Sequence, residues 1–153
     1  MKLSPGATLG LLLSLAVAFA TPTAAQMDPA PAHPELRGVL DDFGGAAGLA
    51  GLMDDLMVLM LDNPRLRPFF ETIDQRLLKR HLAEQFCVIL GGDCSYTGRT
   101  MIESHAGLGI TRADFNALVE DLQTAMNRRG IPFRAQNRLL AVLAPMHREI
   151  VER

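Results

Sequence analysis

Apolar residues recur along this chain at intervals of three and four positions, and no segment shows the strict alternation of a half-buried strand. Across residues 46–61 they gather on one face of a helix, which Pro64 and the two polar residues before it are expected to end. Asp74 has the position of an N-cap, and apolar side chains follow it at helical spacing as far as the Gly91-Gly92 pair. The pattern therefore predicts an all-α protein.

Capping and turn signals divide the second half of the chain. Thr111 and Asp114 have the spacing of a capping box, with Asp where Glu or Gln is usual, and predict a helix that Gly130 ends. Residues 133–151 form the last predicted helix, which Pro145 should kink because proline has no backbone N–H to donate. Two shorter helices are expected, at residues 36–43 and in a turn from Met101 to His105. The prediction is thus four substantial helices, two short ones and no sheet.

The N-terminal region has a different character. Lys2 precedes a largely apolar run over residues 9–20, which is too short to cross a bilayer comfortably as a permanent helix. Small residues suited to a cleavage site follow, ending at Ala20 and again at Ala25. We interpret residues 1–25 as a secretory signal peptide and expect an exported, periplasmic protein without stable membrane association after cleavage. An uncleaved N-terminal anchor is the alternative.

One small domain follows this region. Residues 26–34 are proline-rich and predict a linker that is not helical, and residues 35–153 have the size of one domain. The chain of 153 residues has 15 Lys and Arg against 17 Asp and Glu, without a basic stripe, so nucleic acid is not an expected partner. Its apolar content of 48% fits a domain that also wraps an apolar cofactor, and fits an ordinary helical core equally well.

The chain has two cysteines, Cys87 and Cys94, with Gly91-Gly92 between them to turn the backbone. An oxidising compartment favours a disulfide between them. The alternative is a buried free Cys87 and an unrelated Cys94 in a loop. The sequence lacks the C-x-x-C-H motif, which excludes the standard covalent attachment of a c-type haem, and it shows no zinc-type cluster of Cys and His.

Several short motifs occur along the domain. They are Gly44-Gly45, the segment 62–70 that ends in Phe69-Phe70, Leu90-Gly91-Gly92, Tyr96-Thr97-Gly98, and His105 with Leu108-Gly109-Ile110-Thr111 after it. In combination, over about residues 39–151, they resemble the group 1 truncated haemoglobins. The resemblance implies a truncated globin fold, a two-over-two helical sandwich that encloses haem b and binds O2, NO and CO.

The resemblance makes His105 the proximal ligand of the haem iron. A ligating histidine needs an acceptor for its second ring N–H, and a backbone carbonyl is expected to be free in the turn before Gly107. Phe70 matches the phenylalanine that packs on the haem face of globins. Three further apolar residues would line the proximal side and the haem edge: Met101, Leu108 and Phe115. Without the resemblance, each of them is equally an ordinary core residue.

The distal side departs from the family pattern. Many group 1 members carry a tyrosine on the second helix and a glutamine on the fourth, whereas the matching positions here hold Met57, Leu78 and Leu82. These side chains donate no hydrogen bond, so we expect dioxygen to be held loosely and nitric oxide to bind easily. His81, on the same helix, matches a histidine that ligates iron as sixth ligand in some members. The alternative for His81 is a place at the haem rim, near a propionate or solvent.

Two other histidines have weaker claims. His147 lies near a histidine that bonds covalently to a haem vinyl group in some relatives, although a surface position is the favoured interpretation. His33 falls in the predicted linker and is expected to be incidental.

The main functional hypothesis is a haem protein that binds diatomic ligands or cycles electrons outside the cytoplasm. One alternative is a gas or redox sensor in which a Cys87–Cys94 disulfide alters the distal helix. Another is nitric oxide dioxygenase activity, which requires a reductant that the sequence does not identify. A haem-free helical interaction domain is disfavoured because His105 is present.

Overall fold

The computed structural model describes residues 27–152, and within that range the regular elements are all helices, which confirms the predicted class. The predicted signal peptide over residues 1–25 lies outside the described residues. In chain order the helices are η1 (Pro34–Leu36), α1 (Arg37–Asp42), α2 (Gly45–Asp62), α3 (Arg67–Phe70), α4 (Gln75–Ile89), α5 (Met101–His105), α6 (Arg112–Arg128), α7 (Phe133–Leu143), η2 (Ala144–Met146) and α8 (His147–Ile150).

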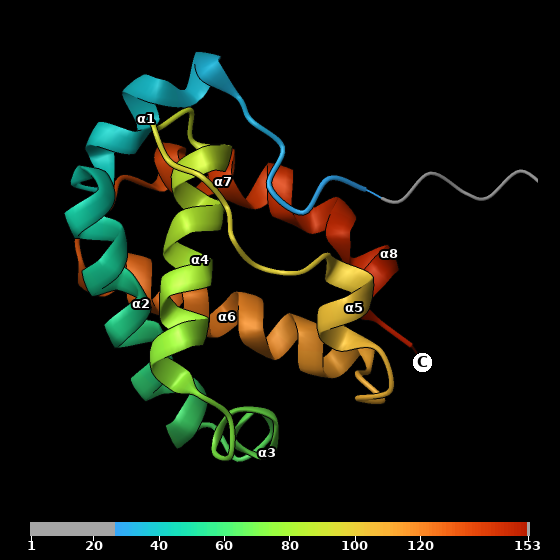
Figure 1. Cartoon of the computed structure of the whole chain (residues 1–153). Coiled ribbons are helices and arrows are strands. Elements are labelled where there is room, and N and C mark those ends of the chain that lie inside the picture. The colour runs from blue at the N-terminus through green and yellow to red at the C-terminus, as the bar shows by residue number, and fades with distance from the viewer. Residues whose placement is uncertain (1–26, 153) are drawn as a thin grey trace, which may run out of the picture.

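Two layers of helices make up the molecule (Figure 1). Helices α2 and α4 run side by side in one layer, and α6 and α7 cross behind them in the other. Apolar side chains fill the space between the layers, and those removed most completely from solvent include Leu49, Leu52, Met53, Ile89, Met126 and Leu139. Full burial of each such side chain contributes about 1.5–3 kcal/mol. The two-over-two sandwich is therefore held mainly by its central apolar layer.

The predicted helix starts are present. The Asp74 side chain accepts the backbone N–H of Leu77 at 2.9 Å and caps α4. Thr111 and Asp114 form the capping box of α6, each side chain accepting the backbone N–H of the other. Each cap satisfies donors that the first turn of a helix leaves free.

Two segments differ from the predicted helices. The last predicted helix is divided at Pro145 into α7, the 3₁₀ turn η2 and α8, because proline cannot donate the backbone bond that an uninterrupted helix requires. Helix α3 was not predicted. Pro68 lies in its first turn, where a fixed φ favours helix and the missing N–H costs nothing.

The predicted linker lies against the domain instead of projecting from it. The Met27 N–H donates to Glu149 at 2.7 Å, and the buried Gln85 amide donates to the Pro29 carbonyl at 2.5 Å. Ala30 is buried as well. The segment is non-helical up to Pro34, as its prolines predict, but composition could not reveal that a buried amide on α4 requires its carbonyl.

Among residues 27–152, no single helix is long and apolar enough to cross a membrane. The segments Pro34–Asp42 and Gly45–Asp62 reach that length and composition only together, and they meet at an angle of 64°. The apolar face of α2 is buried in the core of the sandwich.

Candidate functional site

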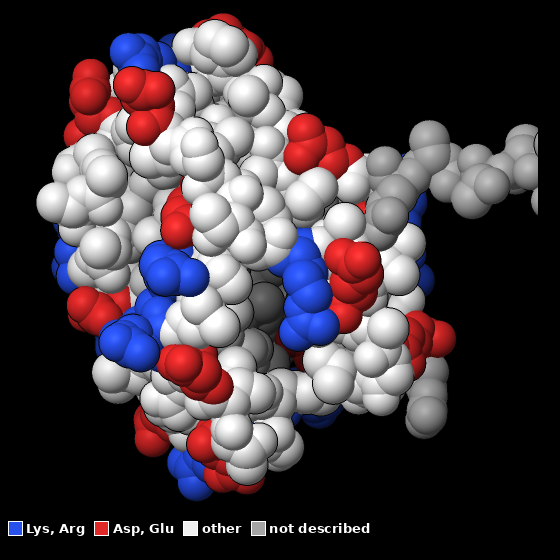
Figure 2. Space-filling model, in the orientation of Figure 1, with Lys and Arg blue, Asp and Glu red and all other residues white. Residues whose placement is uncertain are grey.

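The face of the molecule between α4 and α5 is hollowed (Figure 2), and α6 passes behind it (Figure 1). Lys and Arg side chains lie at the rim on both sides of this α4–α5 hollow. Helix α5 carries His105, and α4 carries His81, Leu78 and Leu82. The two predicted iron ligands therefore come from the two helices that flank the hollow.

Helix α5 is only five residues long and is fixed at its start by a capping box. The Thr100 hydroxyl accepts the Glu103 N–H at 3.3 Å, and the Glu103 carboxylate accepts the Thr100 N–H at 3.1 Å. A helix this short is not stable by itself in water, so its cap and its packing decide whether it forms. The Thr-x-x-Glu spacing was visible in the sequence but was not used in the prediction.

The His105 ring is held by its own helix. Its Nδ1 lies 2.7 Å from the Met101 carbonyl oxygen, and since a carbonyl only accepts, Nδ1 carries the proton. The expected acceptor is thus present, one helical turn before His105 rather than in the turn before Gly107. Burial lowers the pKa of His105, and the bond to Met101 opposes that shift without reversing it. The neutral ring leaves Nε2 as a free lone pair, which is the form that ligates metals.

The motif Tyr96-Thr97-Gly98 belongs to the loop that joins the two flanking helices. The Tyr96 hydroxyl donates to the Arg99 carbonyl at 2.7 Å, and a Cβ on Gly98 would lie within 2.3 Å of that hydroxyl oxygen. The Glu84 carboxylate on α4 accepts both the backbone N–H of Thr97 at 2.9 Å and its hydroxyl at 2.6 Å. Glycine at position 98 leaves room for the tyrosine ring, which folds back over the backbone there and would have to move if the residue were larger.

His81 lies against this loop. Its ring and that of Tyr96 have centroids 6.2 Å apart and meet edge-on at 68°, and His81 is partly buried. The Glu84 carboxylate lies nearby. Burial opposes its ionisation, but the two bonds from Thr97 and then the charge of Arg80 outweigh burial, so the pKa of Glu84 is lowered. The structure thus assigns His81 a definite aromatic neighbour that the sequence analysis did not identify.

The apolar residues predicted for the pocket fall into two groups. Met57 and Met101 belong to the buried core, and Phe70, Leu78 and Leu82 pack against it. Two residues lie apart from that cluster. Leu108 is 49% exposed, and Phe115 packs beside His147 with ring centroids 6.1 Å apart. The Nδ1 of His147 lies 3.0 Å from the Ala144 carbonyl, while His33 lies 2.9 Å from Glu35 at the start of η1.

Cys87 and Cys94 form a disulfide with their Cα atoms 6.0 Å apart, as predicted. The bond joins the C-terminal half of α4 to the loop that carries Tyr96. It therefore adds a covalent link between the loop and the helix that also carries His81.

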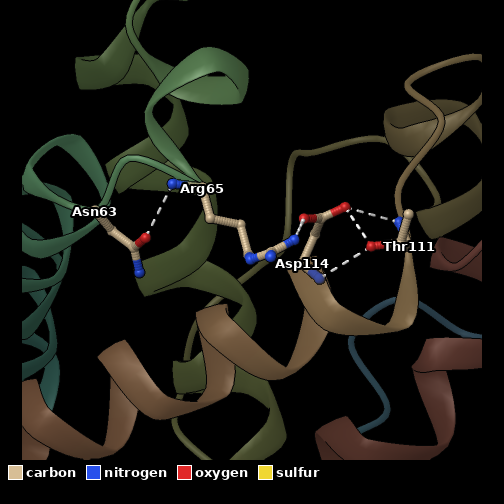
Figure 3. Close-up of polar contacts among 4 residues, drawn as sticks. All are labelled: Asn63, Arg65, Thr111 and Asp114. Carbon is tan, nitrogen blue, oxygen red and sulfur yellow. Dashed lines mark hydrogen bonds and ion pairs between the residues drawn. The ribbon is translucent and has the colours of Figure 1, made fainter.

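A polar bridge links the end of α2 with the start of α6 (Figure 3). Asn63 accepts the Arg65 N–H at 3.1 Å, and the Arg65 guanidinium lies 3.0 Å from the Asp114 carboxylate. Bonds from the Thr111 hydroxyl and backbone, and then the charge of Arg65, lower the pKa of Asp114. The Thr111–Asp114 pair is visible in the sequence as a local spacing, whereas Arg65 is not, because its contact with Asp114 joins residues far apart in the chain.

Known proteins resemble this chain both in sequence and in fold. The model of the bacterial-like globin family matches residues 38–152. The group 1 truncated haemoglobin of Mycolicibacterium paratuberculosis is 31% identical over 116 residues, which is 76% of this chain and 85% of that protein. The structure of the truncated haemoglobin of Tetrahymena pyriformis in its Fe(III) form gives a TM-score of 0.71 at 20% identity, covering 75% of this chain and 98% of that one.

A second solved structure, the 2/2 haemoglobin of a Synechococcus species with covalently attached haem, gives a TM-score of 0.69 at 20% identity and the same coverage. At this identity the two structures establish the fold. The family model and the relative from Mycolicibacterium reach further, because they match the sequence across most of its length. The chain therefore belongs to the bacterial-like globin family and, within it, to the group 1 truncated haemoglobins, haem proteins that bind diatomic ligands.

Proposed function

We propose that this globin holds haem b through Nε2 of His105 and binds diatomic gases at an apolar distal face. The observation that carries the proposal is the 2.7 Å contact between His105 Nδ1 and the Met101 carbonyl. This bond fixes the tautomer and the direction of the ring, as the outer partners of ligating histidines do in general. It leaves the other nitrogen unprotonated and available as a ligand.

The surroundings of His105 fit haem. The α4–α5 hollow is flanked by helices whose apolar side chains include Leu78, Leu82 and Met101, which suit a flat apolar macrocycle. The basic side chains at its rim suit the carboxylates of the haem propionates. When bound, the haem iron supplies the coordination position that takes a diatomic ligand.

The distal residues favour nitric oxide and carbon monoxide over dioxygen. Met57 is buried, Leu78 and Leu82 are partly buried, and none of the three side chains can donate a hydrogen bond. Bound dioxygen, which carries partial negative charge on its outer atom, therefore gains no hydrogen bond from these side chains. Nitric oxide and carbon monoxide are less polar when bound and do not lose affinity for want of such a bond. Dioxygen storage is accordingly the least favoured role within the family.

A second candidate function is electron transfer with His81 as sixth iron ligand. The observation in its favour is the partly buried position of His81 on α4, one of the two helices that flank the hollow. Replacing His81 with Leu should abolish a six-coordinate low-spin spectrum. An unchanged spectrum would show that another group, or none, is the sixth ligand.

Three further proposals concern the reaction, His147 and the N-terminal segment. Nitric oxide dioxygenase activity would need an external reductant. A covalent bond from His147 to a haem vinyl group is tested by extraction with acidified acetone, because haem that leaves the protein freely rules the bond out. Export to the periplasm is supported by the apolar run over residues 9–20 and by the disulfide.

The gas-binding proposal is tested by adding carbon monoxide to the ferrous protein reconstituted with one equivalent of haem. We expect a saturable shift of the Soret band with a stoichiometry of about one carbon monoxide per haem. In the His81→Leu variant, binding should be at least as fast, since a competing ligand is removed. Protein that takes up haem but binds no carbon monoxide would contradict the gas-binding role.

A further inference from the structure

A groove beside α4 reaches the disulfide. It lies between α2 and α4, has a volume of about 330 Å³ and includes both cysteines in its lining. The small side chains of Ala46, Ala50 and Ala83 leave the space open above them. Cys87 is only 2% exposed, whereas Cys94 is partly buried, so Cys94 is the more accessible of the two residues.

The charges that line this groove are balanced. Lys79 lies 2.6 Å from Asp54, and Arg80 lies 3.6 Å from Glu84. All four residues line the groove, so it carries no net charge that would repel an approaching thiolate. Exchange at a disulfide depends on such access and on the thiolate fraction of the attacking thiol.

The loop beyond Cys94 has three further contacts with its surroundings. Tyr96, two residues after Cys94, meets the His81 ring, and Thr97 donates twice to Glu84. Thr100 then caps the helix that holds His105. The disulfide therefore anchors one end of the segment from Cys94 to Thr100. Side chains of this segment touch α4, and its other end begins α5.

We propose that Cys87–Cys94 is a thiol–disulfide exchange site that small dithiols reach through this groove, and that Tyr96 transmits its redox state to His81. The effect on haem ligation rests on the proposed function, while the exchange chemistry does not. While the bond is intact, the Tyr96 ring holds the His81 imidazole at the rim of the site. Reduction releases Cys94, frees Tyr96 to move and lets His81 turn toward the iron position.

The dithiol supplies the two electrons that the exchange requires. One of its thiolates attacks Cys94 Sγ, the Cys87–Cys94 bond breaks, and Cys87 Sγ leaves as a thiolate that takes a proton from water. The second thiolate of the reagent then attacks the reagent's sulfur in the mixed disulfide and releases Cys94 as a thiolate, which is protonated in turn. The protein gains two electrons and two protons, and the dithiol becomes a cyclic disulfide.

The first test uses the full chain without haem, so that it does not depend on the proposed function. Dithiothreitol is added without denaturant, and reduction is followed by mass spectrometry after trapping of the thiols. We expect reduction of the folded protein, faster hydrogen exchange at the Thr97 amide, and a shifted ring resonance of His81 in the NMR spectrum. The His81→Leu variant assigns that resonance. Reduction that requires unfolding, or an unmoved His81 resonance after reduction, would overturn the proposal.

A pair of variants tests the role of Tyr96 while the disulfide stays intact. Tyr96→Leu removes the aromatic ring and should shift the His81 resonance in the same direction as reduction. Tyr96→Phe is the matched control, since it keeps the ring and loses only the bond to the Arg99 carbonyl. Equal His81 spectra for wild type and Tyr96→Leu would show that Tyr96 does not position His81, which would contradict the second half of the proposal.

The haem-loaded protein then reports the consequence for ligation. Ferric wild type and ferric Cys94→Ser are compared, so that no thiol reagent reaches the iron. We expect a larger six-coordinate low-spin fraction in Cys94→Ser, and the increase should disappear when His81 is also replaced with Leu. An equal or smaller low-spin fraction in Cys94→Ser would overturn the link to His81. Failure of haem to bind at all would instead contradict the proposed function, with the haem-free results unaffected.

Discussion

The two sides of the α4–α5 hollow, which we propose are the proximal and distal sides of a bound haem, are built in different ways. On the α5 side, the cap, the proposed iron ligand and the acceptor for its ring proton all lie between Thr100 and His105. On the distal side, Met57 comes from α2, Leu78 and Leu82 come from α4, and the neighbour of His81 comes from the loop after α4. The proximal side is thus made within one short segment, and the distal side is assembled from several.

This difference indicates what each side contributes. A histidine held within its own helical turn keeps its direction when the rest of the protein moves, which suits a permanent ligand. A distal face made from two helices and a loop can change its shape when any of them shifts, which suits a region that decides which ligand binds. Loss of His105 should therefore have the largest effect, and the other changes should have smaller ones.

The largest effect is expected from His105→Ala. Loss of an outer partner of a metal ligand already costs about 10–100-fold in affinity, so loss of the ligand itself should weaken haem binding by more than about 100-fold. Haem titration followed at the Soret band measures the change. His33→Ala is the matched control, because that histidine lies next to η1 and its ring contacts the Glu35 carboxylate. Equal haem affinity in His105→Ala and wild type would remove the proposed proximal ligand.

The distal side should respond to a new hydrogen-bond donor. Leu78→Gln conserves most of the side-chain volume and introduces an amide, and one hydrogen bond contributes about 0.5–1.5 kcal/mol. Dioxygen should then dissociate about two- to tenfold more slowly, as measured by stopped-flow displacement with carbon monoxide. Leu77→Gln is the control, since Leu77 is 40% exposed on the same helix. Identical rates in both variants would show that Leu78 does not face the bound gas.

The α5 cap can be weakened without changing the proposed iron ligand. Thr100→Ala removes the hydroxyl of the capping box and should lower the free energy of unfolding by about 1 kcal/mol in a denaturant titration. Thr111→Ala makes the same change at α6 and should cost about as much. Only Thr100→Ala should also broaden the visible bands of the haem complex. If both variants leave the bands unchanged, the cap does not control the orientation of His105.

The smallest effect concerns the polar bridge between α2 and α6. The pKa of Asp114 lies below its ordinary value of 3.8, chiefly through the Thr111 hydroxyl and backbone and then through Arg65. The ionised carboxylate therefore adds stability that is complete above that value and is lost as the pH falls through the lower pKa of the folded state. The difference in unfolding free energy between wild type and Asp114→Asn should shrink as the pH is lowered from about 5 toward 2. In a Thr111→Ala background this pH dependence should be weaker, and a dependence of undiminished size would assign the shift to Arg65 instead.

Features that depend on residues close together in the chain were predictable from the sequence. The helix starts at Asp74 and Thr111, the break at Pro145 and the Cys87–Cys94 disulfide all follow from local spacing and the geometry of single residue types. His105 was proposed as the iron ligand from the motif around it, which stays a prediction, and its carbonyl acceptor was expected, although one turn too late in the chain.

Features that join distant parts of the chain were not predictable. Arg65 meets Asp114 across 49 positions, and Gln85 meets the Pro29 carbonyl across 56. No periodicity reports such pairs, because each depends on how the layers pack once the helices exist. The contact between Tyr96 and His81 is of the same kind, since it requires the loop to fold back along α4.

The most direct test of the central claim is the absorption spectrum of the full-length protein with one equivalent of haem, recorded in the ferric state and again after reduction with dithionite. If His105 holds the iron, the spectra should be those of a histidine-ligated haem. The ferrous form should show a single broad visible band when His105 is the sole axial ligand, or sharp split bands when His81 is bound as well. Free-haem spectra, or protein that takes up no haem under these conditions, would contradict the account.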